Sequence, residues 1–536
     1  MEDLGDIIAR VRSAGLSEAD CRKLEALIDT VAWLQEELEG NALTLARLRS
    51  LFGLAASEKT KDVLGDQSEG EEGERESERS KDDAKSSEKP KGHGRKAASD
   101  YAGAERIGVA HASLSGGDPC PRCPQHKRGK VYVLVEPHTL VRVVGRAPLS
   151  ARVYELETLR CNLCGAVFSA QPPAGVGSKK YDASAASMIA LLKYGTGLPF
   201  HRLERLQGNL GIPLPAATQW EIVEEAAEEV APAHQVLVRE AAQGRVMHND
   251  DTSMQVLELR KEIERLEASG ETERTGIFSS SIVSLLADGH RVALYFTGRK
   301  HAGENIADLL RQRSAELDPP MQMCDGLERN LPGEFKTVLA NCLAHGRRHF
   351  VEVASSFPKE CRFVLETLRD VYRHDAVARE RGLSDDERLR YHQEHSAPLM
   401  RGLEHWMAEE IEEKRVEPNS TLGAAIAYMQ RRWDKLTLFL RKPGAPLDNN
   451  ICERALKKAI LNRKNAYFYK TENGARVGDL FMGLIHTAEL AGENPFDYLT
   501  ALLEHTEELR RHPEQWLPWR YRSTLAERAA ARSPPP

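Results

Sequence analysis

A long charged stretch limits how this chain can fold. Residues 56–100 are almost wholly charged or small, with the run SEGEEGERESERSKDD near the centre. Such a stretch cannot bury enough apolar surface to offset the entropy lost on ordering. We therefore predict a disordered linker here. The 536 residues should then fold as several units rather than as one globule.

The segment before the linker has heptad spacing. Two rows of mostly apolar residues repeat every seventh position: Leu24, Val31, Leu38, Leu45 and Phe52, and Leu27, Leu34, Asn41 and Leu48. A seam of this length with one polar break is typical of a dimeric coiled coil. We predict that residues 1–55 form an oligomerisation helix, which makes the protein a homo-oligomer. An amphipathic helix packed on its own domain remains the alternative.

Two CxxC pairs follow the linker. Each pair can present two thiolates to one ion, and four thiolates complete a closed tetrahedral Zn²⁺ site. Short apolar β-type runs lie between the pairs, so residues 101–180 are predicted to form a zinc ribbon. This segment holds 11 basic residues against 5 acidic ones, which favours contact with DNA. The predicted structural zinc ligands are Cys120, Cys123, Cys161 and Cys164.

In the remaining chain the spacing of apolar residues changes twice. Residues 183–232 are predicted to form three helices, the third over 216–230, which is compatible with a helix-turn-helix but also with plain helical hairpins. Strand patterns begin at 245 with RVMHND, GIFSSSIVSLL, RVALYFTGR and MQMC, and residues 358–440 then have a helical pattern. The chain is therefore predicted to be multidomain α/β, with a helical insertion in its mixed core.

Three carboxylates occupy chemically informative places. Asp250 ends one strand pattern, Asp325 ends another, and Glu453 lies in the first turn of a helix opened by Asp448, Asn449 and Asn450. Phosphoryl transfer with two metal ions needs closely spaced oxygen ligands, and Mg²⁺ prefers carboxylate oxygen. Among 81 acidic residues, any one of these alone would be interpreted as a solvated surface group.

Several segments resemble one known family, the transposases of insertion-sequence 66. They are HNDDTSMQVL at 248–257, CDG at 324–326, CLAHGRRHF at 342–350, DNNICERALKKAILNRKNAYF at 448–468 and HTAELAGENPFDYL at 486–499. The coiled coil, ribbon and helical region also occur in the family's order. The resemblance implies a ribonuclease H-like core with a DDE triad of Asp250, Asp325 and Glu453, binding Mg²⁺ or Mn²⁺. The family usually has Glu where Asp251 stands, so Asp250 and Asp251 both remain candidates for the first ligand.

Basic residues near the triad are the predicted DNA contacts. They are His345, Arg347, Arg348, Lys457, Arg463 and Lys464. A Cys-x-x-His pair at Cys342 and His345 could bind a metal, but no further Cys or His partners are apparent nearby in the sequence. We therefore predict a packed structural role for Cys342. The net charge of −7 does not argue against DNA, because residues 441–470 hold 8 basic residues against 2 acidic ones.

The predicted function is transposition of a bacterial insertion element: end cleavage followed by joining of 3′ hydroxyls to target DNA. The alternatives are a non-catalytic zinc-ribbon DNA-binding protein derived from a transposase, and a ribonuclease H-like nuclease. No signal peptide or membrane span is apparent, so a cytoplasmic, nucleoid-associated protein is expected, with possible accessory proteins of the same element. The predicted order is coiled coil (1–55), linker (56–100), zinc ribbon (101–180), helical DNA-binding region (181–240), core (241–357), helical insertion (358–440), final core helix with Glu453 (441–485) and C-terminal helical region (486–536).

Overall fold

The computed structural model describes residues 112–118, 130–132, 147–160, 167–174, 179–270 and 274–532. The predicted coiled coil, the linker and all four cysteines of the predicted zinc ribbon lie outside these residues. The described residues fall into two compact units, one within Glu71–Pro148 and one within Leu149–Pro536. In the smaller unit, Gly117 and Asp118 pair with Val131 through backbone hydrogen bonds. The larger unit contains every element named below.

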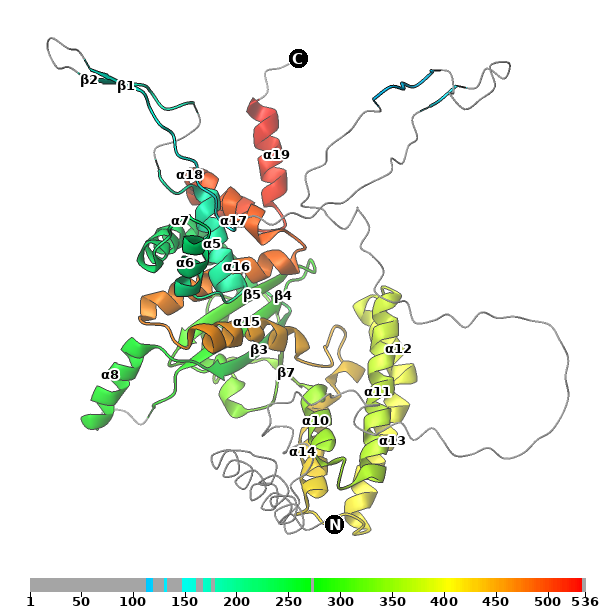
Figure 1. Ribbon diagram of the computed structural model, residues 1–536. Coiled ribbons are helices and arrows are strands. Elements are labelled where there is room, and N and C mark those ends of the chain that lie inside the picture. Colours follow the sequence, from blue (N-terminus) through cyan, green and yellow to red (C-terminus); the bar gives the residue numbers. More distant parts are fainter. Residues whose placement is uncertain are drawn as a thin grey trace, which may run out of the picture. The chain divides into compact units, whose positions relative to one another are not determined.

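A five-stranded mixed sheet lies at the centre of the larger unit (Figure 1). Its strands are β3 (Val246–Ser253), β4 (Phe278–Leu285), β5 (Arg291–Gly298), β6 (Met321–Cys324) and β7 (Val338–Asn341), in the order β5-β4-β3-β6-β7. Strands β3, β4 and β5 pair antiparallel, whereas β6 runs parallel to β3 and β7 runs parallel to β6. The four strands expected from the sequence, β3 to β6, are thus present, and β3 occupies the middle of the sheet.

Helices cover both faces of this sheet. On one face, the Tyr295 hydroxyl donates to the carbonyl of Ala455 in α15 (Asn450–Ala466) and bonds His486 in α16 (Glu472–Leu490). On the other face, Ser284 donates to a carbonyl of α7 (Ala216–Ala242), and Asn305 of α9 (Ala302–Leu310) donates to a strand serine. Because neighbouring side chains on a strand point to opposite faces, successive residues of β3 face different helices.

Three helical segments precede the sheet, as the sequence indicates. They are α5 (Ala183–Ala190) with the π-helical turn η3 (Leu191–Gly195), α6 (Phe200–Asn209) and α7. The third helix was expected to end at 230 but continues through Pro232 to Ala242. The reason is packing: Val230, Ala233 and Leu237 are fully buried at helical spacing, and this apolar face outweighs the one N–H that the proline lacks.

A helical region lies between β7 and α15 in the sequence. It comprises α10 (Leu343–Val353), α11 (Pro358–Glu380), α12 (Asp385–His395), α13 (Ala397–Glu412), α14 (Thr421–Leu436) and the 3-10 turn η5 (Leu438–Leu440). These helices share an apolar core separate from the one under α15 and α16. Helix α14 also packs on α10 and on β7, the strand at one edge of the sheet. The helical region therefore contacts the sheet next to β6.

The remaining elements lie at the periphery of the sheet and helices. They are the hairpin β1 (Thr158–Arg160) and β2 (Val167–Ser169), α8 (Leu257–Ala268), η4 (Glu328–Asn330), α17 (Pro495–Glu504), α18 (Thr506–Arg511), η6 (Pro513–Trp516) and α19 (Tyr521–Arg532). No helix within the described ranges combines the length and the apolar character that crossing a membrane requires.

A close contact between α9 and η4 generates the first prediction. A Cβ at Gly303 would lie 2.2 Å from the carbonyl oxygen of Leu331 and 2.6 Å from that of Arg329, so backbone would have to move. Gly303→Ala should therefore lower the free energy of unfolding by about 2 kcal/mol or more. At Gly346 in α10 the nearest atom is the flexible Met429 side chain at 3.5 Å. Gly346→Ala should be neutral or stabilise by up to about 1 kcal/mol. Urea unfolding measures both, and equal effects would contradict the prediction.

Candidate active site

Asp250 lies in β3 on the face covered by α15. Its Oδ1 accepts a hydrogen bond from the backbone N–H of Asp251 at 2.8 Å. The pKa of Asp250 is raised from 3.8 to about 7, mainly by burial and also by the negative charges of Asp325, Asp251 and Glu453, against the lowering effect of that hydrogen bond. Asp325 and Glu453, the other two carboxylates predicted from the sequence, therefore lie close enough to Asp250 to raise its pKa. Acids far apart in the chain, at 250, 325 and 453, form one cluster.

Asp325 is held in a turn directly after β6. Gly326 has a φ of +85°, a conformation that favours glycine, and lets the chain leave the sheet. The Oδ1 of Asp325 accepts hydrogen bonds from the backbone N–H of Leu327 at 3.0 Å and from Asn330 Nδ2 at 2.6 Å. The hydroxyl of Tyr428 in α14 donates to its carbonyl at 3.0 Å. Both carboxylate bonds use Oδ1, which fixes the orientation of the group.

Buried amides beneath the cluster connect its two strands. Gln322 Nε2 donates to Asn249 Oδ1 at 2.9 Å and to the carbonyl of Asn330 at 2.7 Å. Asn249 Nδ2 donates to the same carbonyl at 2.9 Å. All three side chains are fully buried. The network positions Asn330, which in turn orients Asp325. Sequence reasoning missed these amides, although Asn249 and Gln322 sit as polar residues inside strongly apolar strand patterns.

Glu453 is positioned through Asn449, which is wholly buried. The backbone N–H of Asn449 donates to Cys342 Sγ at 3.2 Å, and its Nδ2 donates to the Asn249 carbonyl at 3.1 Å. Its Oδ1 lies 3.2 Å from His248 Nδ1. These bonds fasten the start of α15 to β3 and to the start of α10. The sequence motif singled out this asparagine only as part of a helix start.

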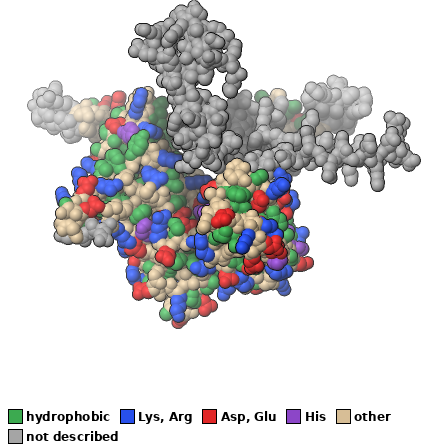
Figure 2. Space-filling view, turned by 90° about the horizontal axis from the view of Figure 1, so that it is seen from below, with side chains coloured by type: hydrophobic (Ala, Val, Ile, Leu, Met, Phe, Trp, Pro, Cys, Tyr) green, Lys and Arg blue, Asp and Glu red, His purple; other side chains and the backbone are tan. Residues whose placement is uncertain are grey.

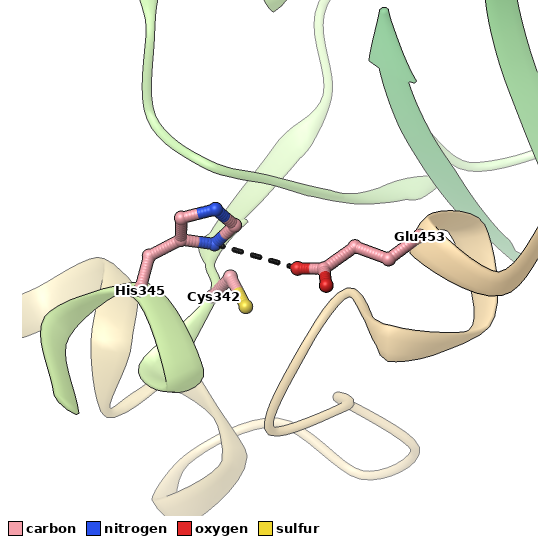
Figure 3. Close-up of side chains that lie close together, drawn as sticks. All are labelled: Cys342, His345 and Glu453. Carbon is pink, nitrogen blue, oxygen red and sulfur yellow. Dashed lines mark ion pairs between the residues drawn. The ribbon is translucent and has the colours of Figure 1, made fainter. Parts of the chain in front are cut away.

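Helix α10 brings a cysteine and a histidine to the same place. Cys342 is the N-cap residue and is fully buried, and burial raises the pKa of its thiol to about 12. His345, in the first turn, points at Glu453, with 3.8 Å between its Nδ1 and Glu453 Oε1 (Figure 3). His345, which the sequence analysis predicts to lie near the triad, is therefore next to Glu453.

Asp251 faces the opposite side of the sheet. Its Oδ2 lies 2.8 Å from His301 Nδ1, and its Oδ1 lies 3.5 Å from Arg329. Only 2% of its side chain is exposed. The two adjacent acids thus have different surroundings: Asp251 is paired with His301 and Arg329, whereas Asp250 lies among carboxylates.

The basic residues predicted to contact DNA also differ in their surroundings. Arg463 is turned inward, with hydrogen bonds to Thr252 Oγ1 at 3.1 Å and Ser253 Oγ at 2.7 Å. Lys457 and Lys464 are exposed on α15. Arg347 and Arg348 are half-buried on α10. Of the predicted DNA contacts, only Lys457 and Lys464 are therefore exposed on the helix that carries Glu453.

Comparison with known proteins assigns the family. The family model described as Transposase IS66 family matches residues 179–477, which is more than half of the chain and includes all three carboxylates. The chain belongs to this family of transposases. The resemblance drawn from the sequence motifs is thereby confirmed.

Three uncharacterised relatives from Sinorhizobium fredii (strain NBRC 101917 / NGR234) are similar to this IS66 family member. Protein y4jD is 33% identical over 198 residues, which cover 36% of this chain and 38% of y4jD. Protein y4hP is 25% identical over 434 residues, covering 74% and 75%, and y4qI is 24% identical over 326 residues, covering 59% and 58%. The chain thus spans less than two thirds of y4jD and y4qI.

The unequal surroundings of Asp250 and Asp251 generate a prediction for this transposase. An acid with a raised pKa keeps its proton longer in the folded state, so stability falls as pH rises from about 4 to about 7. Without added divalent cations at pH 8, Asp250→Asn should raise the free energy of unfolding, by on the order of 2 kcal/mol. Asp250→Asn should also make the free energy of unfolding fall less as pH rises. The fall that remains is due to Asp479, whose pKa burial also raises to about 7.

Asp251→Asn is the matched control and should act in the opposite direction, because it removes a charge paired with His301 and Arg329. Urea unfolding of both variants across this pH range makes the measurement. A loss of stability in Asp250→Asn equal to that in Asp251→Asn would show that burial and nearby carboxylates do not make the charged form of Asp250 unfavourable.

Proposed function

We propose that this protein cleaves the ends of an insertion element and joins the freed 3′ hydroxyls to target DNA. The observation that carries the proposal is the meeting of Asp250, Asp325 and Glu453 inside the region matched to the transposase family. Strands β3 and β6 are parallel neighbours in which His248 pairs with Met323. Asp250 and Asp325, each two residues further along its strand direction, are therefore brought to neighbouring positions. Helix α15 supplies the third acid from the face that Asp250 occupies.

We further propose that the core is ribonuclease H-like. Support comes from the mixed sheet, in which three antiparallel strands are followed by two parallel ones, and from the helix that carries an acid across one face. The helices α11 to α14 stand between Asp325 and Glu453 in the sequence, as expected for an insertion into such a core. Tyr428 of α14 contacts the Asp325 backbone, so the insertion would also help to shape the site.

The donor set fits Mg²⁺ or Mn²⁺. It consists of hard carboxylate oxygens. Burial and the charges of the nearby carboxylates raise the pKa of Asp250, and a bound divalent cation would oppose both effects. Asp250, Asp325 and Glu453 would hold the ions, which supply Lewis acidity toward the phosphodiester when bound. The chain's own contribution is orientation: Asn330 fixes one oxygen of Asp325, and Asn449 fixes the helix that presents Glu453.

A basic face of α15 is the proposed path of one DNA strand. Arg454, Lys457 and Lys464 are exposed and recur at helical spacing, so they share one side of the helix that begins beside Glu453. The face ends at Tyr467 and Phe468, whose side chains are 69% and 46% exposed. Exposed aromatic rings beside cations are suited to stacking on unpaired bases.

This basic face differs from the side of the molecule on which charges of both signs are mixed. Figure 2 shows lysine and arginine side chains interspersed with aspartate and glutamate over the visible side of the molecule. With a net charge of −7, attraction to phosphate has to come from local groups of cations.

The triad prediction tests the proposed chemistry. Asp250→Ala, Asp325→Ala and Glu453→Ala should each abolish both cleavage of element ends and joining of pre-cleaved ends. The losses should not add in combined variants, because one missing ligand already disrupts the site. Gel assays with labelled DNA ends and Mg²⁺ make the measurement. Binding to the ends should persist, since the basic groups that contact phosphate are unchanged.

Asp251→Asn serves as the control and should reduce cleavage less than Asp250→Asn does, when both are compared at a temperature where both are folded. Efficient joining by Asp325→Ala or Glu453→Ala protein would refute the triad. Cleavage by the wild type without any joining of pre-cleaved ends would instead favour a nuclease.

The proposed DNA path yields a separate prediction. Lys457→Ala and Lys464→Ala should each weaken DNA binding and reduce the slope of log K against log salt by about 0.9, the effect of losing one phosphate contact. Lys458 is the matched control, because it lies on the same helix but pairs with Glu489 at 2.9 Å. Lys458→Ala should leave the slope unchanged. Fluorescence anisotropy at several salt concentrations measures the slopes, and equal slopes for all three variants would exclude this path.

A further inference from the structure

A second cluster of possible ligands lies beside the carboxylates. The ligand atoms of Cys342, His345 and Glu453 all lie within 4.8 Å of one another (Figure 3). Cys342 and His345 come from the N-cap and first turn of α10, and Glu453 comes from the first turn of α15. The sequence pattern indicated only Cys342 and His345 as possible ligands, because Glu453 is more than a hundred residues further along the chain.

Two of these atoms are buried without a hydrogen bond. Neither His345 Nδ1 nor Glu453 Oε1 has a hydrogen-bond partner among the described residues. They face each other at 3.8 Å, which is too long for a hydrogen bond. Buried polar atoms are nearly always satisfied by a partner, which can be an ion. A cation held between the imidazole nitrogen and the carboxylate oxygen would satisfy both atoms.

The sulfur of Cys342 is also suited to becoming a thiolate. It accepts the backbone N–H of Asn449 at 3.2 Å, and it also accepts the backbone N–H of His345. Hydrogen bonds donated to sulfur favour its anionic form, although burial opposes ionisation in the cation-free protein. A coordinated metal ion removes that obstacle because it deprotonates a thiol that it binds.

We propose that Cys342, His345 and Glu453 bind one zinc-like divalent cation. Thiolate, imidazole and carboxylate together select Zn²⁺ over Mg²⁺, and three protein ligands leave the fourth tetrahedral position to water. On binding, the Cys342 thiol gives its proton to solvent, and the neutral His345 ring coordinates through Nδ1. The site differs from the predicted zinc ribbon, whose four cysteines are elsewhere in the chain.

The cation would also regulate the enzyme, and this consequence rests on the proposed function. Glu453 belongs to both the zinc-like site and the proposed magnesium cluster. A Zn²⁺ ion that engages Glu453 would draw the carboxylate toward His345 and away from Asp250 and Asp325. Zn²⁺ should therefore inhibit DNA cleavage in competition with Mg²⁺.

Co²⁺ binding to the full-length protein tests the site directly. Equilibrium dialysis gives the number of ions bound, and thiolate-to-cobalt absorption reports sulfur ligation. Cys342→Ala and His345→Ala should each bind one Co²⁺ fewer per chain than the wild type. Cys361→Ala, at another buried cysteine, and His349→Ala, one turn along α10, should bind as many as the wild type. Any ions held by the four cysteines of the predicted zinc ribbon are bound equally by all these proteins, so they do not affect the differences in Co²⁺ content.

Equal Co²⁺ content in the wild type, Cys342→Ala and His345→Ala would overturn the proposal. Thermal unfolding checks that each variant is folded. His345 is the safer position, since 23% of its side chain is exposed and its loss leaves the Cys342 hydrogen bonds in place.

DNA cleavage at fixed Mg²⁺ tests the regulatory consequence. Half-inhibition of Cys342→Ala, relative to its own uninhibited rate, should need at least about tenfold more Zn²⁺ than half-inhibition of the wild type. The binding measurement does not depend on DNA chemistry. If the wild type binds one Co²⁺ more than the variants but cleaves no DNA, the proposed function is refuted and the metal site is retained. If the wild type cleaves DNA but binds no more Co²⁺ than the variants, the metal site is refuted and the proposed function is retained.

Discussion

The buried amide of Asn449 is the interaction on which the arrangement of the site depends. Its side chain bonds the backbone of β3 and the ring of His248, while its own N–H bonds the sulfur at the start of α10. Three elements from distant parts of the sequence therefore meet at one residue. An apolar side chain could fill the same space, but it would leave buried donors and acceptors unpaired and would not fix the direction in which α15 begins. The position of Glu453 follows from that direction.

The same region concentrates negative charge at a cost to stability. Asp250 is buried among carboxylates, and one backbone N–H offsets only part of that effect. Its neighbour Asp251, on the opposite face, is matched with His301 and Arg329. Asp250 and Asp251 are adjacent in the chain but have opposite surroundings, because neighbouring side chains on a strand point to opposite faces of the sheet. Uncompensated charge of this kind is typical of sites arranged for a ligand rather than for stability.

The helical region also takes part in the geometry around the carboxylates. Tyr428 donates to the backbone of Asp325, and α10 supplies both Cys342 and His345. A variant in these helices could therefore change the site without touching a carboxylate. The close packing of Gly303 against η4 provides a similar route from the other face, since Asn330 of η4 holds Asp325.

The sequence by itself determined four strands of the central sheet, the helical region that follows them and the three acids that lie near one another. Strand alternation, helical spacing and short motifs are local properties, so β3 to β6 and the helices from 358 to 440 could be predicted from the amino-acid sequence alone. The different surroundings of Asp250 and Asp251 could not, because they depend on which sheet face α15 covers. Nor could the partners of Asp325 and Glu453: Asn330, Asn449 and His345 become neighbours only when distant segments pack. Burial and the resulting pKa of Asp250 are likewise properties of the assembled fold. The third ligand of the Cys342 and His345 pair lay outside any local pattern, and only tertiary contact between α10 and α15 supplies it.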